Sequence, residues 1–427
     1  MKSKQIIFSL LLILLTANLI FGTVKYFEHK NDKKRYIRQF AEVIDIVQSN
    51  YVDESQIKSK DLIYNAIDGM LSNLDDYSSF HRPQEYSKLK EENAGQFAGI
   101  GVKIEIRKND LLIIEPMPNS PGSEAGLLSN DTIYMVNGKS LEDEFKSIDK
   151  EFSRLSIDER NFKKLRFATT LIKGEVGTTV KLGIFRESEN RRFDVDVIRG
   201  IIKLESVRNG HMIKKDILYV WITGFNNNTA NELSKILSKN ANLKGLIIDL
   251  RNNPGGLLET SNGVCNIFMP PGQLIVSTIP RNKKNEYRHY SDNKRKKYLD
   301  LALVILINGQ SASGSEIVAG CLKDYKIATL VGETSYGKGS VQTLIPLGDK
   351  SALRLTTAKY YTPNKYVIHK KGVAPDVEVL MTKEQKLLFY KNINRYHLNK
   401  ETIEDDPQLM KAIELVNEKM AARSKTQ

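Results

Sequence analysis

The stretch LALVILINGQSASGSEIVAG (residues 301–320) joins a continuous apolar run to a Gly- and Ser-rich turn and the start of a helix. Such uninterrupted apolar runs are typical of parallel strands that are buried on both faces. Ser313 lies in the turn, where a side chain is exposed and the next backbone N–H groups can stabilise a developing oxyanion. Because Ser is also a common helix cap, capping is the alternative role of Ser311, Ser313 and Ser315.

Strands and helices alternate on both sides of this stretch. Strand patterns occur at ILYVWITGF (217–225), LKGLIIDL (243–250) and KIATLVG (326–332), with helical patterns between them. This alternation predicts an α/β domain, which we assign to residues 206–381. A charged helical tail is expected over residues 382–427.

The stretch GETSYGKGS (332–340) nearly matches the phosphate-binding P-loop G-x-x-x-x-G-K-[ST]. However, Gly339 stands where the P-loop needs a hydroxyl residue that binds Mg²⁺. A P-loop also needs a helix after the lysine, whereas the residues that follow are strand-like and include Pro346. The pattern therefore disfavours a nucleotide site, and we expect no metal or other cofactor.

Lys338 is instead a candidate general base for Ser313. None of the six histidines lies in a motif with turn glycines and apolar walls, so a Ser–His–Asp arrangement is unsupported. A lysine accepts a proton only when neutral, so this role requires that burial lower its pKa. Gly337 and Gly339 would allow the backbone to approach a bound peptide closely. An ordinary lysine in a surface turn remains the alternative.

A third stretch, LIIDLRNNPGGLLE (246–259), runs from an apolar strand into a Gly-Gly turn. Gly255 and Gly256 allow backbone N–H groups to converge on a ligand oxygen. A plain turn explains the same residues, so this stretch indicates a functional site only in combination with the other two stretches.

The chain between residues 95 and 205 differs from the α/β part. GQFAGIGVKIEI (95–106) and GEVGTTVKLGIFR (174–186) have the alternating, β-branched pattern of strands. We predict a small β-rich module over 95–205, with a helical insertion near 142–166. Apolar residues at helical spacing precede it and predict a helical segment over 25–94.

Near the N-terminus, the uncharged stretch IIFSLLLILLTANLIFGTV (6–24) is long enough to span a bilayer. We expect an uncleaved anchor after a short cytoplasmic segment (1–5), with a cleaved signal peptide as the alternative. The basic flank from Lys25 to Arg35 favours a cytoplasmic position for the rest of the chain. Long domains can translocate despite such charges, and we expect the catalytic domain to be extracytoplasmic, or periplasmic in a bacterium.

The chain carries a net charge of +13, much of it in short basic runs such as 281–284 and 293–297. No nucleic-acid motif accompanies these runs, so we interpret them as solvated surface and expect no nucleic-acid partner. Only two cysteines are present, which excludes a disulfide scaffold. Cys265 and Cys321 are interpreted as buried free thiols.

In this order, DLRNNPGG, NGQSASGSEIVAG and VGETSYGKGSVQ resemble the motifs of the C-terminal processing (tail-specific) serine peptidases. TTAKYYTP and KGVAPDVEV resemble the family's end segments, and the β-rich module resembles its PDZ domain, with GIGV as the carboxylate loop. The resemblance spans about residues 60–380. It implies an α/β fold with a crotonase/ClpP-like catalytic domain, an inserted PDZ-like β module and helical terminal segments.

The resemblance also implies roles for single residues. Ser313 matches the nucleophile, Lys338 the general base and Gln342 the residue that orients the lysine. The oxyanion hole would combine the N–H of Gly314 with one from Gly255 or Gly256. The PDZ residues implied to bind a peptide carboxylate are Gly99, Ile100, Gly101 and Val102.

The implied function is a serine endopeptidase with a Ser-Lys(-Gln) catalytic centre that hydrolyses bonds in or near the exposed C-terminal tails of protein substrates. The PDZ domain would recruit the substrate or gate the site, and association through terminal helices would give a homodimer. The sequence departs from the family at Gly314, which replaces Ala, and at Gln310, which replaces Gly. The alternative is a catalytically silent, membrane-anchored PDZ scaffold.

Overall fold

The computed structural model describes residues 32–53, 57–240, 242–393 and 403–424. The chain divides into two compact units, Met1–Pro83 with Thr343–Thr356, and Gln84–Gln342 with Thr357–Gln427. The predicted membrane span at 6–24 lies outside the described residues. Within the described ranges, no helix is both long and apolar enough to cross a membrane.

The smaller unit is mostly helical. It contains a helix at residues 32–50, α2 (Ser59–Ser72), β1 (Ser79–His81) and residues 343–356, which run from the end of β17 (Ser340–Pro346) into β18 (Ala352–Tyr361). β1 pairs antiparallel with the first residues of β18. Tyr64 and Phe80 pack against each other in its core, and the Tyr64 hydroxyl donates a hydrogen bond to Asp349 at 2.5 Å.

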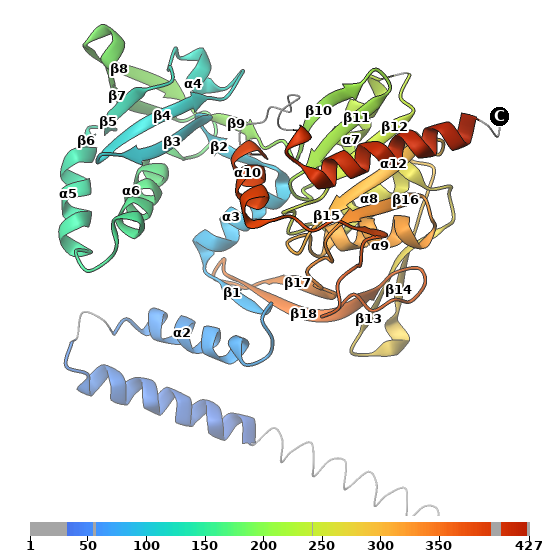
Figure 1. Cartoon of the computed structure of the whole chain (residues 1–427). Helices are drawn as coiled ribbons and strands as arrows, with labels where there is room; N and C mark the ends of the chain where they lie inside the picture. Colours follow the sequence, from blue (N-terminus) through green and yellow to red (C-terminus); the bar gives the residue numbers. More distant parts are fainter. Residues whose placement is uncertain (1–31, 54–56, 241, 394–402, 425–427) are drawn as a thin grey trace, which may run out of the picture. The chain divides into compact units, whose positions relative to one another are not determined.

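A six-stranded sheet forms the centre of the larger unit (Figure 1). Its strand order is β10 (Val207–Lys214), β11 (Ile217–Ile222), β12 (Gly245–Asp249), β15 (Ala302–Ile307), β16 (Ala328–Gly332) and β19 (Val377–Glu378). Every neighbouring pair is parallel except β10 and β11. All six residues of β15 are buried, as its uninterrupted apolar sequence predicts.

Helices cover both faces of this sheet, which explains why β11 and β15 are apolar and buried along their whole length. One face packs against α7 (Thr229–Ser238), α8 (Leu258–Phe268) and α9 (Gly314–Asp324). The other face packs against α12 (Pro407–Ser424), which lies across the sheet in Figure 1 and contributes Leu409, Ala412 and Val416 to the core. The helix α10 (Lys383–Ile393) precedes α12 in the sequence.

A second group of strands is antiparallel. β13 (Leu274–Pro280) pairs with β14 (Tyr287–Tyr290) on one side and with the last residues of β18 on the other. The short 3-10 helix η3 (Lys283–Asn285) joins β13 to β14.

The stretch predicted to be a β-rich module follows α3 (Pro83–Ala94). One sheet there has the order β3 (Val102–Arg107), β4 (Asp110–Pro116), β5 (Asp131–Val136), β7 (Thr179–Arg186) and β8 (Arg191–Ile198), with β6 (Lys139–Ser140) beside β5. β2 (Gln96–Gly99) pairs with β9 (Gly200–Lys203). The connecting helices are α4 (Pro121–Glu124), α5 (Leu141–Glu151), α6 (Ile157–Ile172) and η2 (Glu187–Glu189).

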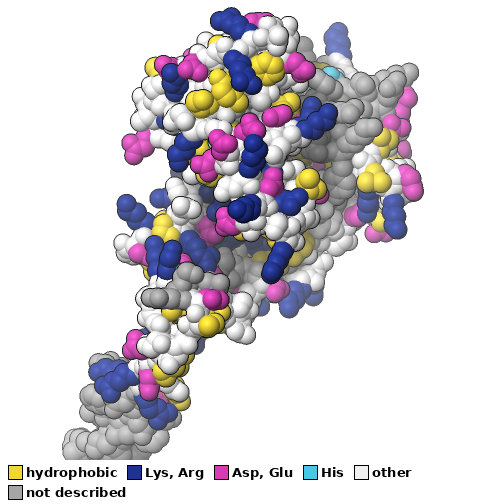
Figure 2. Space-filling model, turned by 90° about the vertical axis from the view of Figure 1, so that its left-hand side faces the viewer, with side chains coloured by type: hydrophobic (Ala, Val, Ile, Leu, Met, Phe, Trp, Pro, Cys, Tyr) yellow, Lys and Arg dark blue, Asp and Glu magenta, His cyan; other side chains and the backbone are white. Residues whose placement is uncertain are grey.

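The mixed α/β fold is thus confirmed. Cys265 and Cys321 are both buried and free, as predicted. On the face drawn in Figure 2, Lys and Arg side chains are interspersed with Asp and Glu, an arrangement typical of solvated surface.

Candidate active site

Three loops meet at one edge of the central sheet. They follow β12, β15 and β16, which are neighbouring parallel strands. Parallel strands end at the same edge, and ligands of such sheets bind beyond their carboxyl ends. The loops are the three stretches that the sequence singled out, at residues 250–257, 308–313 and 333–339.

Ser313 lies directly before α9 in a strained backbone conformation. Its φ of 54° and ψ of −111° are unusual for a residue with a Cβ atom, and such strain concentrates at active sites. The other two serines of the turn are buried. Ser311 donates to the Leu250 carbonyl at 2.7 Å, and Ser315 donates to the Asn253 carbonyl at 2.9 Å. Ser313 is therefore the partly exposed serine of the three.

The glycine loop after β12 lies against this turn. A Cβ atom on Gly255, whose φ is +96°, would come within 2.7 Å of both the Ser313 Cβ and the Gly314 nitrogen. A Cβ atom on Gly256 would overlap the Phe225 carbonyl oxygen. Both positions therefore require glycine, and the loop backbone reaches the predicted nucleophile.

The backbone donors of this region are not equivalent. The N–H of Gly255 is already bonded to the Asn253 side-chain oxygen at 2.8 Å, so it is not available to a substrate. By contrast, the N–H groups of Gly256 and Gly314 have no acceptor among the residues that the structure describes. Of the two residues predicted as the second donor of the oxyanion hole, Gly255 and Gly256, Gly256 is therefore the one whose N–H group is available.

Lys338 lies in the loop after β16 and is partly buried. Its main chain is held at both ends, since its N–H donates to Glu316 Oε2 at 2.9 Å and its carbonyl accepts from the Tyr360 hydroxyl. β17 begins two residues later, where a P-loop requires a helix. Gln342 lies in β17 and donates to the Ser340 hydroxyl at 2.9 Å.

The glycines around Lys338 make a different contact from the one expected. We predicted that they allow close approach to a bound peptide. Instead, a Cβ atom on Gly337 (φ +93°) or on Gly339 would meet the chain's own backbone at residues 369–372. The GETSYGKGS glycines are required by packing within the protein.

The residues predicted to bind a carboxylate connect β2 to β3. Ile100 is buried and its carbonyl accepts from the Gly122 N–H at 2.7 Å, while Gly101 (φ +70°) accepts from the Ser120 hydroxyl at 2.9 Å. In the described part of the chain, β3 pairs with β4 alone. β3 is therefore an edge strand, and α6 packs beside it.

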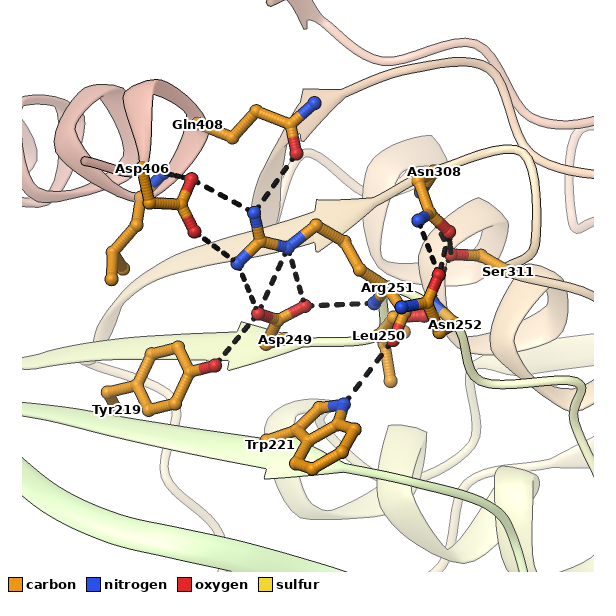
Figure 3. Close-up of polar contacts among 11 residues, drawn as sticks. Tyr219, Trp221, Asp249, Leu250, Arg251, Asn252, Asn308, Ser311, Asp406 and Gln408 are labelled. Atoms are coloured by element: carbon orange, nitrogen blue, oxygen red, sulfur yellow. Dashed lines mark hydrogen bonds and ion pairs between the residues drawn. The ribbon is translucent and has the colours of Figure 1, made fainter. Parts of the chain in front are cut away.

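A buried ion-pair network supports the start of the glycine loop (Figure 3). The Arg251 guanidinium contacts the Asp249 carboxylate at 2.6 Å and the Asp406 carboxylate at 2.8 Å, and it donates to the Gln408 side chain at 3.1 Å. The Tyr219 hydroxyl donates to Asp249 at 2.8 Å, and burial raises its pKa well above the usual range. Asp406, directly before α12, and Gln408, in its first turn, thus hold Arg251 at the start of the loop.

The loops after β12 and β15 are also joined directly, as Figure 3 shows. The Asn308 side chain accepts from the Asn252 N–H at 3.0 Å and donates to the Asn252 side chain at 2.8 Å. The Trp221 ring nitrogen donates to the Arg251 carbonyl at 3.3 Å. These contacts fix the glycine loop relative to the turn that carries Ser313.

Sequence reasoning missed Glu316, Asp406 and Gln408. Ser313 and Glu316 have the S-x-x-E spacing of a capping box, a local signal that identifies Glu316. Asp406 precedes Pro407, which is a pattern of helix starts. Nothing local indicates that Asp406 and Gln408 reach Arg251, because that contact joins positions far apart in the sequence.

Replacing Asp406 with asparagine is expected to lower the free energy of unfolding by about 3–5 kcal/mol, since it removes one partner of a buried charge. Asparagine can still cap α12, where Asp406 accepts from the Leu409 N–H at 3.0 Å, so the variant isolates the charge. Urea denaturation measures the change. Asp405→Asn, at the exposed neighbouring residue, should change stability by less than about 0.5 kcal/mol. Equal losses in both variants would contradict the role of the ion pair.

The chain is similar to known proteins over most of its length. A model of peptidase family S41 matches residues 216–379. The carboxy-terminal-processing protease of Bartonella bacilliformis is 34% identical over 384 residues, which cover 88% of this chain and 82% of that protein. A Staphylococcus aureus protein named a probable CtpA-like serine protease is 32% identical over 390 residues, which cover 91% of this chain and 72% of that protein.

Among solved structures, the photosystem II D1 C-terminal processing protease is 26% identical, with a TM-score of 0.42, and the match covers 80% of this chain and 92% of that one. The chain therefore belongs to peptidase family S41 and is a serine-type peptidase, similar over most of its length to proteins named carboxy-terminal-processing proteases.

Proposed function

We propose that this peptidase hydrolyses peptide bonds in or near the C-terminal tails of proteins, with Ser313 as nucleophile and Lys338 as general base. The observation that carries the proposal is the meeting of three loops at the carboxyl edge of the sheet. There, the strained Ser313 turn adjoins the glycine loop, and Glu316 accepts from the N–H groups of both Ser313 and Lys338. Cleavage of a tailed protein that depends on both side chains tests it.

In the proposed reaction, neutral Lys338 takes the proton of the Ser313 hydroxyl while Oγ attacks the scissile carbonyl carbon. The N–H groups of Gly314 and Gly256 stabilise the oxyanion, and the loss of one such donor typically costs about 10²–10³ in rate. The C–N bond then breaks as Lys338 returns the proton to the leaving amine. Water, activated by Lys338, hydrolyses the acyl-enzyme. Gln342 orients the lysine.

We propose that residues 95–205 are a PDZ domain that recruits the substrate. An edge strand such as β3 can accept a further strand through main-chain hydrogen bonds, which is how PDZ domains bind tails. The turn from Gly99 to Val102 lies at the start of β3, where the amides would receive the terminal carboxylate. Recruitment by the tail explains a preference for bonds near the C-terminus.

Amidation of the substrate's C-terminus is expected to lower kcat/KM by roughly 10- to 100-fold. It removes the carboxylate, and a hydrogen bond to a charged group contributes about 1.5–3 kcal/mol. Initial cleavage rates of one tailed peptide in free and amidated forms measure the effect. Acetylating the peptide's N-terminus, which removes a terminal charge elsewhere, serves as the control. Equal rates for the free and amidated forms would exclude recruitment through the carboxylate.

The remaining parts of the chain fit the same proposal. We infer that residues 206–381 form a crotonase/ClpP-like catalytic domain, supported by the parallel order of β11, β12, β15 and β16 with helices on both faces. The uncharged run at 6–24 supports a membrane anchor, with the catalytic domain outside the cytoplasm.

A homodimer remains a prediction. A silent PDZ scaffold is disfavoured because Ser313 and Lys338 are both present in joined loops.

A further inference from the structure

Glu316 is a fully buried carboxylate in the first turn of α9. Its exposed fraction is 0%, and it lies three residues after Ser313. The reaction described above makes no use of it. Burying a carboxylate costs free energy unless hydrogen bonds compensate, so the contacts of this side chain indicate what it does.

Four donors surround the Glu316 carboxylate. Oε2 accepts from the Ser313 N–H at 2.8 Å and from the Lys338 N–H at 2.9 Å. Oε1 accepts from the Gly337 N–H at 2.7 Å and from the Ser335 hydroxyl at 2.6 Å. A single oxygen atom is therefore shared by the main chains of the proposed nucleophile and the proposed base.

A helix cap explains only part of this arrangement. In a capping box the acidic side chain returns to the N–H of the cap residue, which accounts for the bond to Ser313. The bonds to Gly337 and Lys338 come from the loop after β16 and have no part in capping. They join two loops that are separated by the whole of α9 and β16.

The position also suits a carboxyl group better than a side-chain amide. A carboxylate accepts at both oxygens, whereas an amide carries donors at one end and would face an N–H group with an NH₂ group. Burial raises the pKa of Glu316, and the bonds from Ser335, Gly337, Ser313 and Lys338 oppose that shift. The chain thus keeps a costly buried group at the point where the two loops meet.

We propose that Glu316 is a positioning residue that fixes the nucleophile and the base relative to each other by binding both main chains. This inference rests on the proposed roles of Ser313 and Lys338. Glu316 acts through the backbone of these residues and does not contact the substrate.

Glu316→Gln tests the proposal on the full chain. Because a misplacement of about 1 Å in catalytic groups costs on the order of 10² in rate, kcat for a tailed peptide should fall about 10²-fold. KM should stay within about threefold, since tail binding is unaffected. A simple loss of folded protein would instead lower the active fraction and the thermal midpoint together.

Glu232→Gln is the matched control. Glu232 also lies in the first turn of a helix, α7, and its Oε2 accepts from the Ser206 N–H at 2.9 Å and the Val207 N–H at 3.0 Å, outside the three loops. This variant should lower the thermal midpoint while kcat stays within about threefold, because the bonds of Glu316 to Ser313 and Lys338 remain. A loss of kcat as large as that of Glu316→Gln would assign Glu316 a general structural role and overturn the proposal.

Glu316→Asp covers the case in which the glutamine variant does not fold. It keeps the charge but shortens the side chain by one carbon, so the shared contact is strained and kcat should fall about tenfold with KM unchanged. A folded Glu316 variant with wild-type kcat would refute the positioning role of Glu316 but not the proposed function. The proposed function would still stand if Ser313→Ala were inactive, so the two failures are distinguishable.

Discussion

Ser313→Ala is expected to lower kcat/KM for a tailed protein substrate by on the order of 10⁶, as the loss of the nucleophile does in other serine peptidases. The variant removes only the hydroxyl of Ser313, which is the proposed nucleophile. Release of the C-terminal fragment, followed by mass spectrometry over time, measures the rate.

Ser238→Ala is the control for this variant. Ser238 is an exposed serine at the end of α7, where its hydroxyl donates to the Lys235 carbonyl at 2.9 Å. Its replacement should leave the rate unchanged. If Ser313→Ala cleaved the substrate as fast as Ser238→Ala, Ser313 could not be the nucleophile.

Lys338→Arg is expected to lower kcat/KM by about 10⁴, the upper range for a lost general base. Arginine keeps the positive charge and much of the length, but it does not give up its proton near neutral pH. In the wild type, kcat/KM should rise with pH, because only the neutral amine of Lys338 can accept a proton. A pH series of cleavage rates for both proteins measures these two effects together.

Lys326→Arg provides the comparison for the lysine variant. Lys326 is exposed and lies between α9 and β16, close in sequence to the Lys338 loop. Its replacement should not alter the rate or the pH profile. Near-wild-type activity in Lys338→Arg would show that another group is the base.

The arrangement of the loops follows from local patterns that the sequence displays. Each of the three stretches joins an apolar strand to a turn, and buried parallel strands are readable from uninterrupted runs such as 301–307. Since parallel strands end at one edge, three loops that follow such strands can be expected to meet. The sequence pattern also predicted a strand rather than a helix after Lys338, and β17 is present there.

Contacts between segments that are far apart in the sequence could not be predicted from local patterns. The tail from residue 382 was interpreted from its charges, yet α12 buries Leu409, Ala412 and Val416 against the central sheet. The glycines beside Lys338 were expected to permit close approach to a bound peptide, whereas they pack against residues 369–372 of the chain itself, a contact that no local pattern indicates. Glu316 accepts hydrogen bonds from the Gly337 and Lys338 N–H groups in the loop after β16. This contact could not be predicted for the same reason.

The Glu316 carboxylate and the Arg251 ion pairs have two features in common. Glu316 binds the main chain of two loops of the proposed site, and Arg251 binds carboxylates at the start of the third loop; both groups join segments that are distant in the sequence. Such groups cost free energy on burial. Both groups lie at the three loops, so the free energy that their burial costs accompanies a fixed geometry of these loops.

Ser313 is proposed to form an acyl-enzyme with the help of Lys338. The most direct measurement is the intact mass of the protein, quenched in acid during turnover of an ester substrate, followed by peptide mapping. We expect an added acyl group on the peptide that contains Ser313, with none on that peptide in Ser313→Ala and slower formation in Lys338→Arg. An acyl group on another residue, or undiminished peptide cleavage by Ser313→Ala, would contradict it.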